Sequence, residues 1–491
     1  MRLMALARKV APFIILCVAY LGFASFFDAR EPGRDPDRYY HFAVSKMTSE
    51  LGLLHSLPQP SDLKWDQFFP EKEFLFHQLT SLAYRWQGER GVIEACHILG
   101  ILVLISLLWA GQARTQGLGA ATLIVLLMVF DPTVGPRLIA VRPHLLGVLF
   151  FIMILGALLS ESIPWLLASA VGFGLSYHAF YMPLGLLIAW WAWKKAAPSE
   201  SFRATKIAAA GIAGLAAGYL VNPYFPSPLV LGYQHLLFAL DSAPLPGVSV
   251  GSELLPMQFG RWLGTYWPLI LVIFLIPLAW LERRKPSKEF LCSPAAFAAA
   301  IALGSLLLSR NSPRLLEYSL PCAVIALILF FQKSNPSWCR RTIVGVLVAL
   351  AVVRGFALYE KPRSNHYQIL TNVIMEAIDS VPASAGSAKV YNCSWLLGEF
   401  LIYRRPDLKF VDLLDPRLLQ HVSPEKFEMK RRLLLRDLDY PYRVVKEGFG
   451  ADYFFCGDAD VNDWIEKDAR FMRIYPRVAG SRVRMYRLAP N

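Results

Sequence analysis

Long apolar stretches alternate with short polar segments along most of this chain. The apolar residues come in continuous runs and not at helical or strand spacing, which is typical of segments that lie in lipid. We place about eleven runs at residues 11–27, 92–110, 118–130, 144–160, 163–178, 180–193, 205–221, 266–281, 293–309, 315–332 and 342–358. Some are shorter than the roughly 20 residues of a straight crossing, and 163–193 could be one broken helix. The pattern predicts a polytopic α-helical membrane protein with about 11 transmembrane helices.

Basic residues orient these predicted helices. With the N-terminus in the cytoplasm, the strongest basic clusters fall in cytoplasmic gaps, as the positive-inside rule requires. These clusters are Lys194, Lys195, Arg203 and Lys206; Arg283, Arg284, Lys285 and Lys288; and Lys333, Arg340 and Arg341. The basic start of the chain precedes an apolar run without a clear small-residue cleavage site, so we expect an uncleaved anchor. This topology places residues 359–491 outside the cytoplasm, in the periplasm if the membrane is a bacterial inner membrane.

The segment 359–491 follows a different pattern. Short stretches at 389–391, 408–412, 451–455 and 482–487 predict strands, and 366–380 and 424–447 predict helices. We therefore expect two domains: a transmembrane domain at 1–358, with a large first outer loop at 28–91, and a small α/β soluble domain at 359–491. The second domain has no glycine-rich phosphate motif, which argues against a nucleotide site.

Composition agrees with a membrane protein and excludes other classes. The 491 residues are 55% hydrophobic and 18% charged, and the mean hydropathy is +0.39. The net charge of +13 comes mostly from short clusters between apolar runs, so membrane lipids and not nucleic acid are the expected partners. The seven cysteines are scattered without a CxxC pair, and we expect neither a disulfide framework nor a structural metal.

Residues 34–77 form the only long polar segment in the first half of the chain. Ionisable and aromatic residues gather there: Asp35, Asp37, Tyr39, Tyr40, His41, His55, Asp66, Glu71, Glu73 and His77. The predicted topology adds polar residues from other loops on the same face: Arg137, Arg142, His144, Tyr177, His178, Asn222, Glu253, Arg261, Arg310, Arg314 and Glu317. Such a concentration beside a membrane indicates a reaction site. The alternative is that each residue only caps a helix or extends its polar end to water.

Four short motifs carry a resemblance to a known family. They are Asp37-Arg-Tyr39-Tyr40-His41, the stretch Arg137–His144, Ser249-Val-Gly-Ser-Glu253, and Val390–Ile402 with Trp395 and Gly398. Their order resembles the GT-C glycosyltransferases, polytopic enzymes that use polyprenyl-phosphate-linked sugars, and in layout the oligosaccharyltransferase catalytic subunit. The resemblance implies transfer of a sugar or glycan from a polyprenyl-phosphate donor to a protein, lipid or glycan acceptor at the outer face.

The chain also departs from the family motifs. Arg142 and His144 stand where an acidic pair is expected, which argues against a divalent metal such as Mg²⁺ or Mn²⁺. Leu396 stands where the family has an aspartate that helps to read a Ser or Thr near an acceptor asparagine. The resemblance therefore supports the superfamily better than the asparagine-linked reaction.

Transfer from a lipid phosphate needs a base for the acceptor and a cation for the leaving phosphate. We predict Asp37 as the base, with Asp35 second. Guanidinium groups of Arg142, Arg310 or Arg314 would bind the phosphate, or a metal held by Asp37 and His144 would do so. The remaining predicted substrate-binding residues are Tyr39, Tyr40, His41, His77, Arg137 and Glu253.

Simpler interpretations remain for several of these residues. Asp35 could cap the helix that follows it, and His41 and His77 could be packed loop residues. Glu71-Lys-Glu73 is typical of a solvated turn, and Glu253 could only pair with Arg261. For the whole protein, a lipid transporter or flippase and a non-catalytic membrane scaffold are the alternatives; no inverted repeat favours the former.

Overall fold

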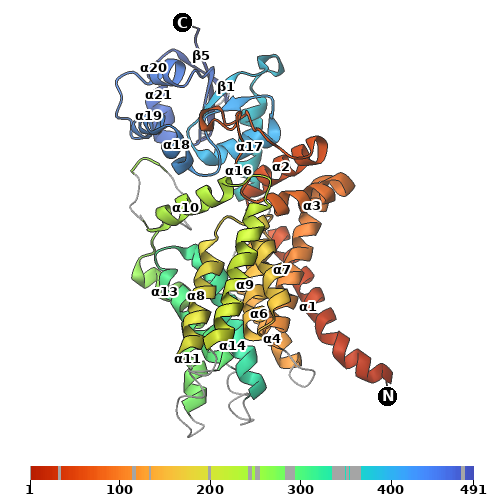
Figure 1. The fold of residues 1–491 in the computed structure, drawn as a ribbon. Helices are drawn as coiled ribbons and strands as arrows, with labels where there is room; N and C mark the ends of the chain where they lie inside the picture. The colour runs from red at the N-terminus through yellow and green to blue at the C-terminus, as the bar shows by residue number, and fades with distance from the viewer. Residues whose placement is uncertain are drawn as a thin grey trace.

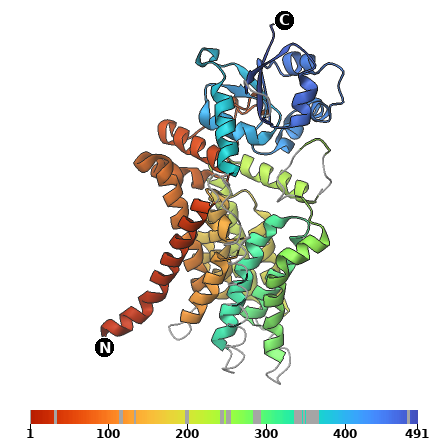
Figure 2. The ribbon, with the colours of Figure 1, turned by 180° about the vertical axis from the view of Figure 1, so that it is seen from behind.

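The computed structural model describes residues 2–30, 35–112, 118–131, 134–196, 201–240, 246–248, 255–281, 293–333, 366–476 and 481–490, with the single residues 345, 349 and 353 (Figure 1). A long bundle of helices forms one end of the molecule and a small sheet with its own helices forms the other. Seen from behind, the start of the first helix and the sheet lie at opposite ends (Figure 2).

The bundle is built from the apolar stretches. Its helices are α1 (Arg2–Arg30), α3 (Phe74–Ala110), α4 (Leu118–Val129), α6 (His144–Leu159), α7 (Ile163–Ser176), α8 (Tyr181–Lys195), α9 (Ser201–Leu220), α11 (Phe259–Leu281), α13 (Pro294–Leu308) and α14 (Leu316–Lys333). Each of the first ten predicted runs therefore coincides with a helix. The eleventh, 342–358, lies almost wholly outside the described residues.

Only some of these helices have the length of a membrane crossing. Within the described ranges, three are long and apolar enough: Val10–Asp28, Phe74–Ala110 and Pro313–Phe331. The stretch 163–193 is two helices, because the backbone becomes extended at Tyr177 (φ −150°, ψ 136°) and ends α7 before α8 begins. The chain has helices suited to a membrane, and the count of eleven crossings stays a prediction.

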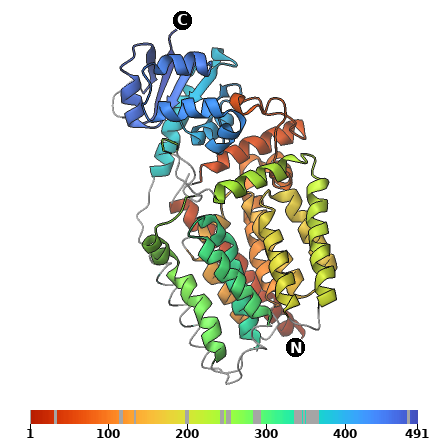
Figure 3. The same ribbon diagram turned by 60° about the vertical axis from the view of Figure 1, so that its left-hand side comes forward.

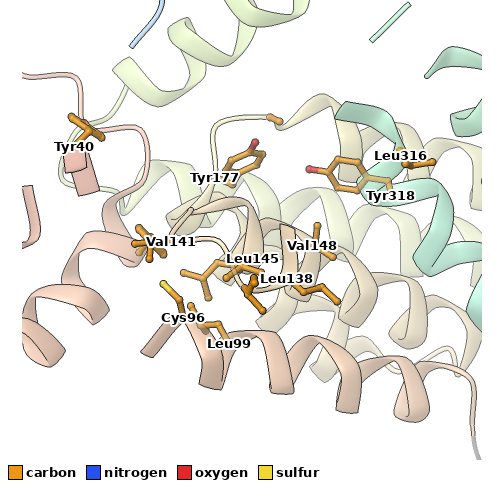
Figure 4. Close-up of a cluster of buried hydrophobic side chains, with 14 of the residues drawn as sticks. Tyr40, Cys96, Leu99, Leu138, Val141, Leu145, Val148, Tyr177, Leu316 and Tyr318 are labelled. Carbon is orange, nitrogen blue, oxygen red and sulfur yellow. The ribbon is translucent and has the colours of Figure 1, made fainter. Parts of the chain in front are cut away.

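The bundle core lies between α3, α6 and α14. Cys96 and Leu99 of α3 meet Leu145 and Val148 of α6 in one buried cluster (Figure 4). The cluster continues to Tyr318 of α14, so three helices distant in sequence share one apolar core that excludes water.

A layer of helices lies across the end of the bundle, between it and the sheet (Figures 1 and 3). It contains α2 (Asp37–Leu51), the first part of α3, and α10 (Ser227–Leu240). Helix α3 bends at Gln87 and Gly88, and Gly88 takes φ +61°, which a glycine adopts without strain. The bend lets one helix serve first the crosswise layer and then the bundle.

The small sheet has five strands in the order β2-β1-β3-β5-β4. These are β1 (Lys389–Asn392), β2 (Lys409–Phe410), β3 (Tyr453–Cys456), β4 (Phe471–Tyr475) and β5 (Arg484–Leu488). β1 is parallel to β2 and β3, and β5 is antiparallel to β3 and β4. The accompanying helices are α16 (His366–Asp379), α17 (Trp395–Arg404), α18 (Pro416–Val422), α19 (Pro424–Leu434), α20 (Pro441–Arg443) and α21 (Ala459–Ile465).

This sheet confirms the predicted C-terminal α/β arrangement, with differences in detail. The four predicted strands are present, whereas β4 and α17 were not predicted. The predicted helix 424–447 is wrong as one element: α19 ends at Leu434, and a new short helix starts at Pro441. Proline lacks the N–H that a continuous helix needs, so it begins a helix more readily than it continues one.

The expectation about the cysteines is also wrong in part. Cys393 and Cys456 form a disulfide, with 5.1 Å between their Cα atoms. They lie at the ends of the neighbouring parallel strands β1 and β3, 63 residues apart in sequence, so no local spacing reveals the pair. Asn392 beside Cys393 is fully buried, and its amide donates to the Asp412 backbone carbonyl at 3.0 Å.

The first outer loop is bound to the edge of the sheet. The Phe410 N–H donates to the Gln59 carbonyl at 2.7 Å, beside a parallel bridge between Pro60 and Phe410. Buried Asp62 forms ion pairs with Lys389, at 2.6 Å, and with Lys426. The loop between α2 and α3 thus ties the crosswise layer to the sheet.

Candidate functional site

Two acidic residues and one arginine form the centre of the candidate site. Asp37 begins α2, and Arg142 lies just before α6. The Arg142 Nε donates to Asp35 Oδ1 at 2.9 Å, and its terminal nitrogen lies 2.8 Å from the same oxygen and 3.0 Å from Asp37 Oδ2. Asp35 does not cap α2, whose cap residue is Pro36 without a side-chain bond. The guanidinium therefore holds both carboxylates, and the charge-assisted bonds fix their positions.

A polar cleft of about 700 Å³, part of it open to solvent, surrounds Asp37 and Arg142. Its walls come from α2, from the segment before α3, from α10 and from the sheet region. The lining residues are Asp37, His41, Lys72, Glu73, Arg142, Pro143, His144, His235, Arg314, Trp395, Glu399, Leu414 and Asp415. Asp35 is not among them, so Asp37 is the carboxylate of the pair that faces the cleft.

Glu399 adds a fully buried carboxyl group to the lining of the cleft. It lies on α17, is fully buried, and neither of its carboxyl oxygens has a hydrogen-bond partner in the described part of the chain. Burial raises its pKa well above the usual range, and the nearby Asp37 and Asp35 raise it further, while Arg142 and Lys72 oppose them. Glu399 thus keeps its proton to a higher pH than an ordinary carboxyl does, beside the ionic pair of Asp37 and Arg142.

An apolar cavity adjoins the polar cleft. It holds about 1680 Å³ of empty space, including space open to the outside, between α6, α8, α10, α13 and α14. Phe151, Tyr181, Leu186 and Ile301 give it an apolar wall. His235, Arg314 and Asp415 line both the cavity and the cleft. The polar cleft and the apolar cavity therefore meet at three ionisable residues.

His41 and His77 form a buried chain with Glu71. The His41 Nδ1 lies 3.0 Å from the His77 Nε2, and the His77 Nδ1 lies 2.9 Å from Glu71 Oε2. Glu71 and Glu73 are 3% and 5% exposed, so the expectation of a solvated turn at Glu71-Lys-Glu73 is wrong. The turn is buried because the Glu71 carboxylate pairs with His77 and the Glu73 carboxylate lines the cleft.

Of the other predicted site residues, some line the cleft and others pack elsewhere. His144 and Arg314 line the cleft with Asp37 and Arg142. Tyr39 and Tyr40 do not line it: Tyr39 packs 4.8 Å from the Phe400 ring and 5.0 Å from the Tyr403 ring, and Tyr40 packs against His41 and His77. The Tyr39 ring thus packs between α2 and α17, and the Tyr40 ring packs between α2 and α3. Both rings were predicted to contact sugar or lipid.

Two arginines also lie away from both spaces. Arg137 forms an ion pair with Glu317 of α14, and the exposed Arg310 lies 6.0 Å from the Phe259 ring. Glu253 and the rest of the Ser249–Glu253 motif lie outside the described residues.

Sequence reasoning missed several residues of the cleft. Lys72 and Glu73 lay within the highlighted polar loop but were assigned to a turn. Glu399 had a signal that was overlooked, since it is the one acidic residue in the otherwise apolar stretch Trp395–Ile402. His235 and Asp415 had no local signal, because only the fold brings them to the cleft.

Comparison with known proteins was made by sequence and by structure. No family model matches the chain, and no curated protein matches it in sequence. The fold is similar to the Archaeoglobus fulgidus oligosaccharyltransferase tethered to an acceptor peptide with an NVT sequon, with a TM-score of 0.60, 10% identity, and coverage of 99% of this chain and 74% of that one. This oligosaccharyltransferase and ArnT, described next, are both GT-C glycosyltransferases.

ArnT from Cupriavidus metallidurans bound to undecaprenyl phosphate gives a TM-score of 0.57 at 13% identity, with 98% of each chain covered. The chain has the GT-C fold. A third structure, AglB from A. fulgidus with an inhibitory peptide and a dolichol-phosphate, gives 0.56 at 10% identity, over 94% of this chain and 72% of that one. The GT-C resemblance of the sequence motifs is confirmed at the level of the fold.

Proposed function

We propose that this protein is a membrane glycosyltransferase that moves a sugar or glycan from a polyprenyl-phosphate donor to an acceptor, with Asp37 as the general base. One observation carries the proposal: the polar cleft at Asp37 and the apolar cavity meet at His235, Arg314 and Asp415. Neighbours of the same fold bind undecaprenyl phosphate and dolichol-phosphate, which are lipids of this type.

The donor fits this pair of spaces by its chemistry. Its prenyl chain would occupy the apolar cavity, where burial of apolar surface stabilises it. Its phosphate would lie at the junction, near the cationic side chains of Arg314 and Lys72, which line the cleft. Its sugar would then extend into the cleft toward Asp37.

The transfer step moves one proton and one bonding pair. Asp37 takes the proton of the acceptor O–H or N–H as that atom attacks the anomeric carbon. The bond from the anomeric carbon to the phosphate oxygen breaks, and the polyprenyl phosphate leaves with the electron pair. Arg314 and Lys72 stabilise the charge that develops on this phosphate. Arg142 keeps the Asp37 carboxylate oriented.

The residues around Asp37 do not fit a divalent metal such as Mg²⁺ or Mn²⁺. The Arg142 guanidinium lies within 3.0 Å of both Asp35 and Asp37 and already supplies the positive charge there. His144 Nε2 lies 3.0 Å from the Arg137 carbonyl, an arrangement that uses this nitrogen as a donor. We therefore assign no step of the transfer to a metal bound by Asp37 and His144.

The transfer would take place at the face of the membrane opposite to the start of α1. The cleft is lined by residues of the crosswise layer, of the adjoining end of the bundle and of the sheet domain. The start of α1 lies at the opposite end of the bundle (Figure 2). With the basic clusters on the cytoplasmic side, the end with the cleft faces the periplasm of a bacterial inner membrane.

Substitution of two glycines tests the donor position. Gly304 lines the apolar cavity, Gly264 of α11 does not, and nothing lies within 4 Å of an added Cβ at either position. With purified protein and polyprenyl-phosphate sugars, Gly304→Phe should raise KM for the donor by at least about tenfold, a loss of about 1.4 kcal/mol. Gly264→Phe should leave KM unchanged. Equal KM values for both variants, or no transfer by the wild type from any donor, would contradict the proposal.

A further inference from the structure

We propose that His41, Glu73 and His77 bind a zinc ion in the wall of the polar cleft. Each offers one ligand atom, and these atoms lie within 4.8 Å of one another. All three residues are at most 5% exposed. Two come from the start of α3 and the turn before it, and His41 comes from α2, so the packing of these helices assembles the group.

The hydrogen bond from His77 Nδ1 to Glu71 leaves the His77 Nε2 as the nitrogen that can bind a metal. Its Nδ1 donates to Glu71 Oε2 at 2.9 Å, which leaves the Nε2 lone pair directed at His41. A ligating imidazole in proteins ordinarily donates its other N–H to a carboxylate or carbonyl, which fixes its tautomer and ring orientation. Glu71 has this role toward His77, and its Oε1 also accepts from the Glu73 N–H at 2.8 Å.

The distance between the two imidazole nitrogens suits a tetrahedral ion. They lie 3.0 Å apart, and two ligands at about 2.0–2.1 Å from tetrahedral zinc lie about 3.3 Å apart. The two imidazole nitrogens would need to move apart by about 0.3 Å, with loss of the single proton between them. The Glu73 oxygen, which lies within 4.8 Å of these nitrogens, would approach them to a similar spacing.

Glu73 provides the independent observation. Its Oε2 is buried and has no hydrogen-bond partner among the described residues, and its Oε1 has only Lys72 at 3.8 Å as an ionic neighbour. An unsatisfied carboxylate oxygen in a buried position is costly. A cation between Glu73 and the two histidines removes this cost.

The ligand set favours zinc over magnesium and manganese. Two imidazoles and one carboxylate are typical of zinc, whereas magnesium and manganese prefer all-oxygen sites. Three protein ligands leave a fourth position, and His41 and Glu73 both line the cleft. This site is separate from the pair of Asp37 and Arg142, and it does not depend on the proposed glycosyl transfer.

Metal binding by the purified full-length protein, with any affinity tag removed, tests the proposal. After treatment with a chelator and dialysis against Zn²⁺, elemental analysis should find one zinc per chain, and calorimetry should give a one-site isotherm. Co²⁺ should give the visible absorption of a tetrahedral ion with nitrogen and oxygen ligands.

Four variants make the assignment specific. His77→Gln and Glu73→Gln should weaken Zn²⁺ binding by at least 100-fold, and Glu71→Gln by about 10–100-fold, the usual effect of an outer-shell carboxylate. His421→Gln, at an exposed histidine of α18, is the matched control and should bind as the wild type does. Circular dichroism without metal checks that each variant is folded.

The outcomes separate a zinc site from a cluster held only by hydrogen bonds. Less than 0.2 zinc per wild-type chain, or unchanged affinity in folded His77→Gln and Glu73→Gln, would overturn the proposal. An octahedral Co²⁺ spectrum would overturn the assignment of a tetrahedral site.

Discussion

The buried acid Glu399 makes a sharp prediction about pH. Its pKa lies well above its usual value because of burial and of the neighbouring Asp37 and Asp35. In the unfolded chain the same carboxyl has a pKa near 4.5. The native state therefore binds a proton that the unfolded state releases, and stability must fall as pH rises above this value toward the native pKa. Below it, both states are protonated and the effect disappears.

The size of the effect follows from this difference. One pK unit corresponds to about 1.36 kcal/mol. The protonated carboxyl therefore costs up to about 1.4 kcal/mol for each pH unit between the unfolded pKa and the native pKa. Glu399→Gln replaces the acid by a neutral group of the same shape and removes this pH-dependent cost.

The assay is thermal unfolding of the purified protein in detergent between pH 4.5 and pH 8. Glu399→Gln and the wild type should melt at similar temperatures near pH 4.5, and the variant should melt higher than the wild type by a margin that widens toward pH 8. Glu425→Gln, at an exposed residue of α19, should follow the wild type throughout. Parallel curves for the wild type and Glu399→Gln would refute the protonated state of Glu399.

Two further predictions test the loop attachment and the phosphate position. Asp62→Asn leaves Lys389 and Lys426 without the carboxylate that they share. Because Lys426 is 33% exposed, we expect the free energy of unfolding to fall by about 2–3 kcal/mol, measured by thermal unfolding. Asp66→Asn, at an exposed residue, should melt as the wild type does. Arg314→Gln should lower kcat/KM for a polyprenyl-phosphate sugar by about 100-fold, because a charge-assisted contact to the phosphate is lost. Arg310→Gln should leave kcat/KM unchanged. Equal losses in both variants would show that Arg310 also takes part in the reaction and would contradict this assignment.

Sequence alone predicted those parts of the fold that depend on local pattern. Continuous apolar runs marked the bundle helices, because a helix in lipid or in a large core is apolar on every side. Short runs of apolar and aromatic residues marked β1, β2, β3 and β5. β4 (Phe471–Tyr475) was not predicted.

The candidate site was predictable only where its residues were close in sequence. Asp35 and Asp37 stood out in a polar loop, but Arg142 reaches them over 107 residues and its role as their shared cation was not foreseen. The Cys393–Cys456 disulfide and the approach of Glu399 to Asp37 likewise depend on tertiary packing. Tyr39 packs against Phe400 and Tyr403, which the sequence did not reveal because an aromatic residue that packs between helices and one that stacks on a sugar look alike in sequence.

The most direct test of the proposed transferase compares Asp37→Asn with Asp35→Asn in sugar release from polyprenyl-phosphate donors. Asp37 faces the cleft and Asp35 holds Arg142. Loss of a general base costs about 10²–10⁴-fold in rate, so Asp37→Asn should lower kcat by at least 100-fold with donor binding intact. Asp35→Asn should lose less and keep the wild-type pH profile. Wild-type turnover by Asp37→Asn would contradict the assignment of Asp37 as the base.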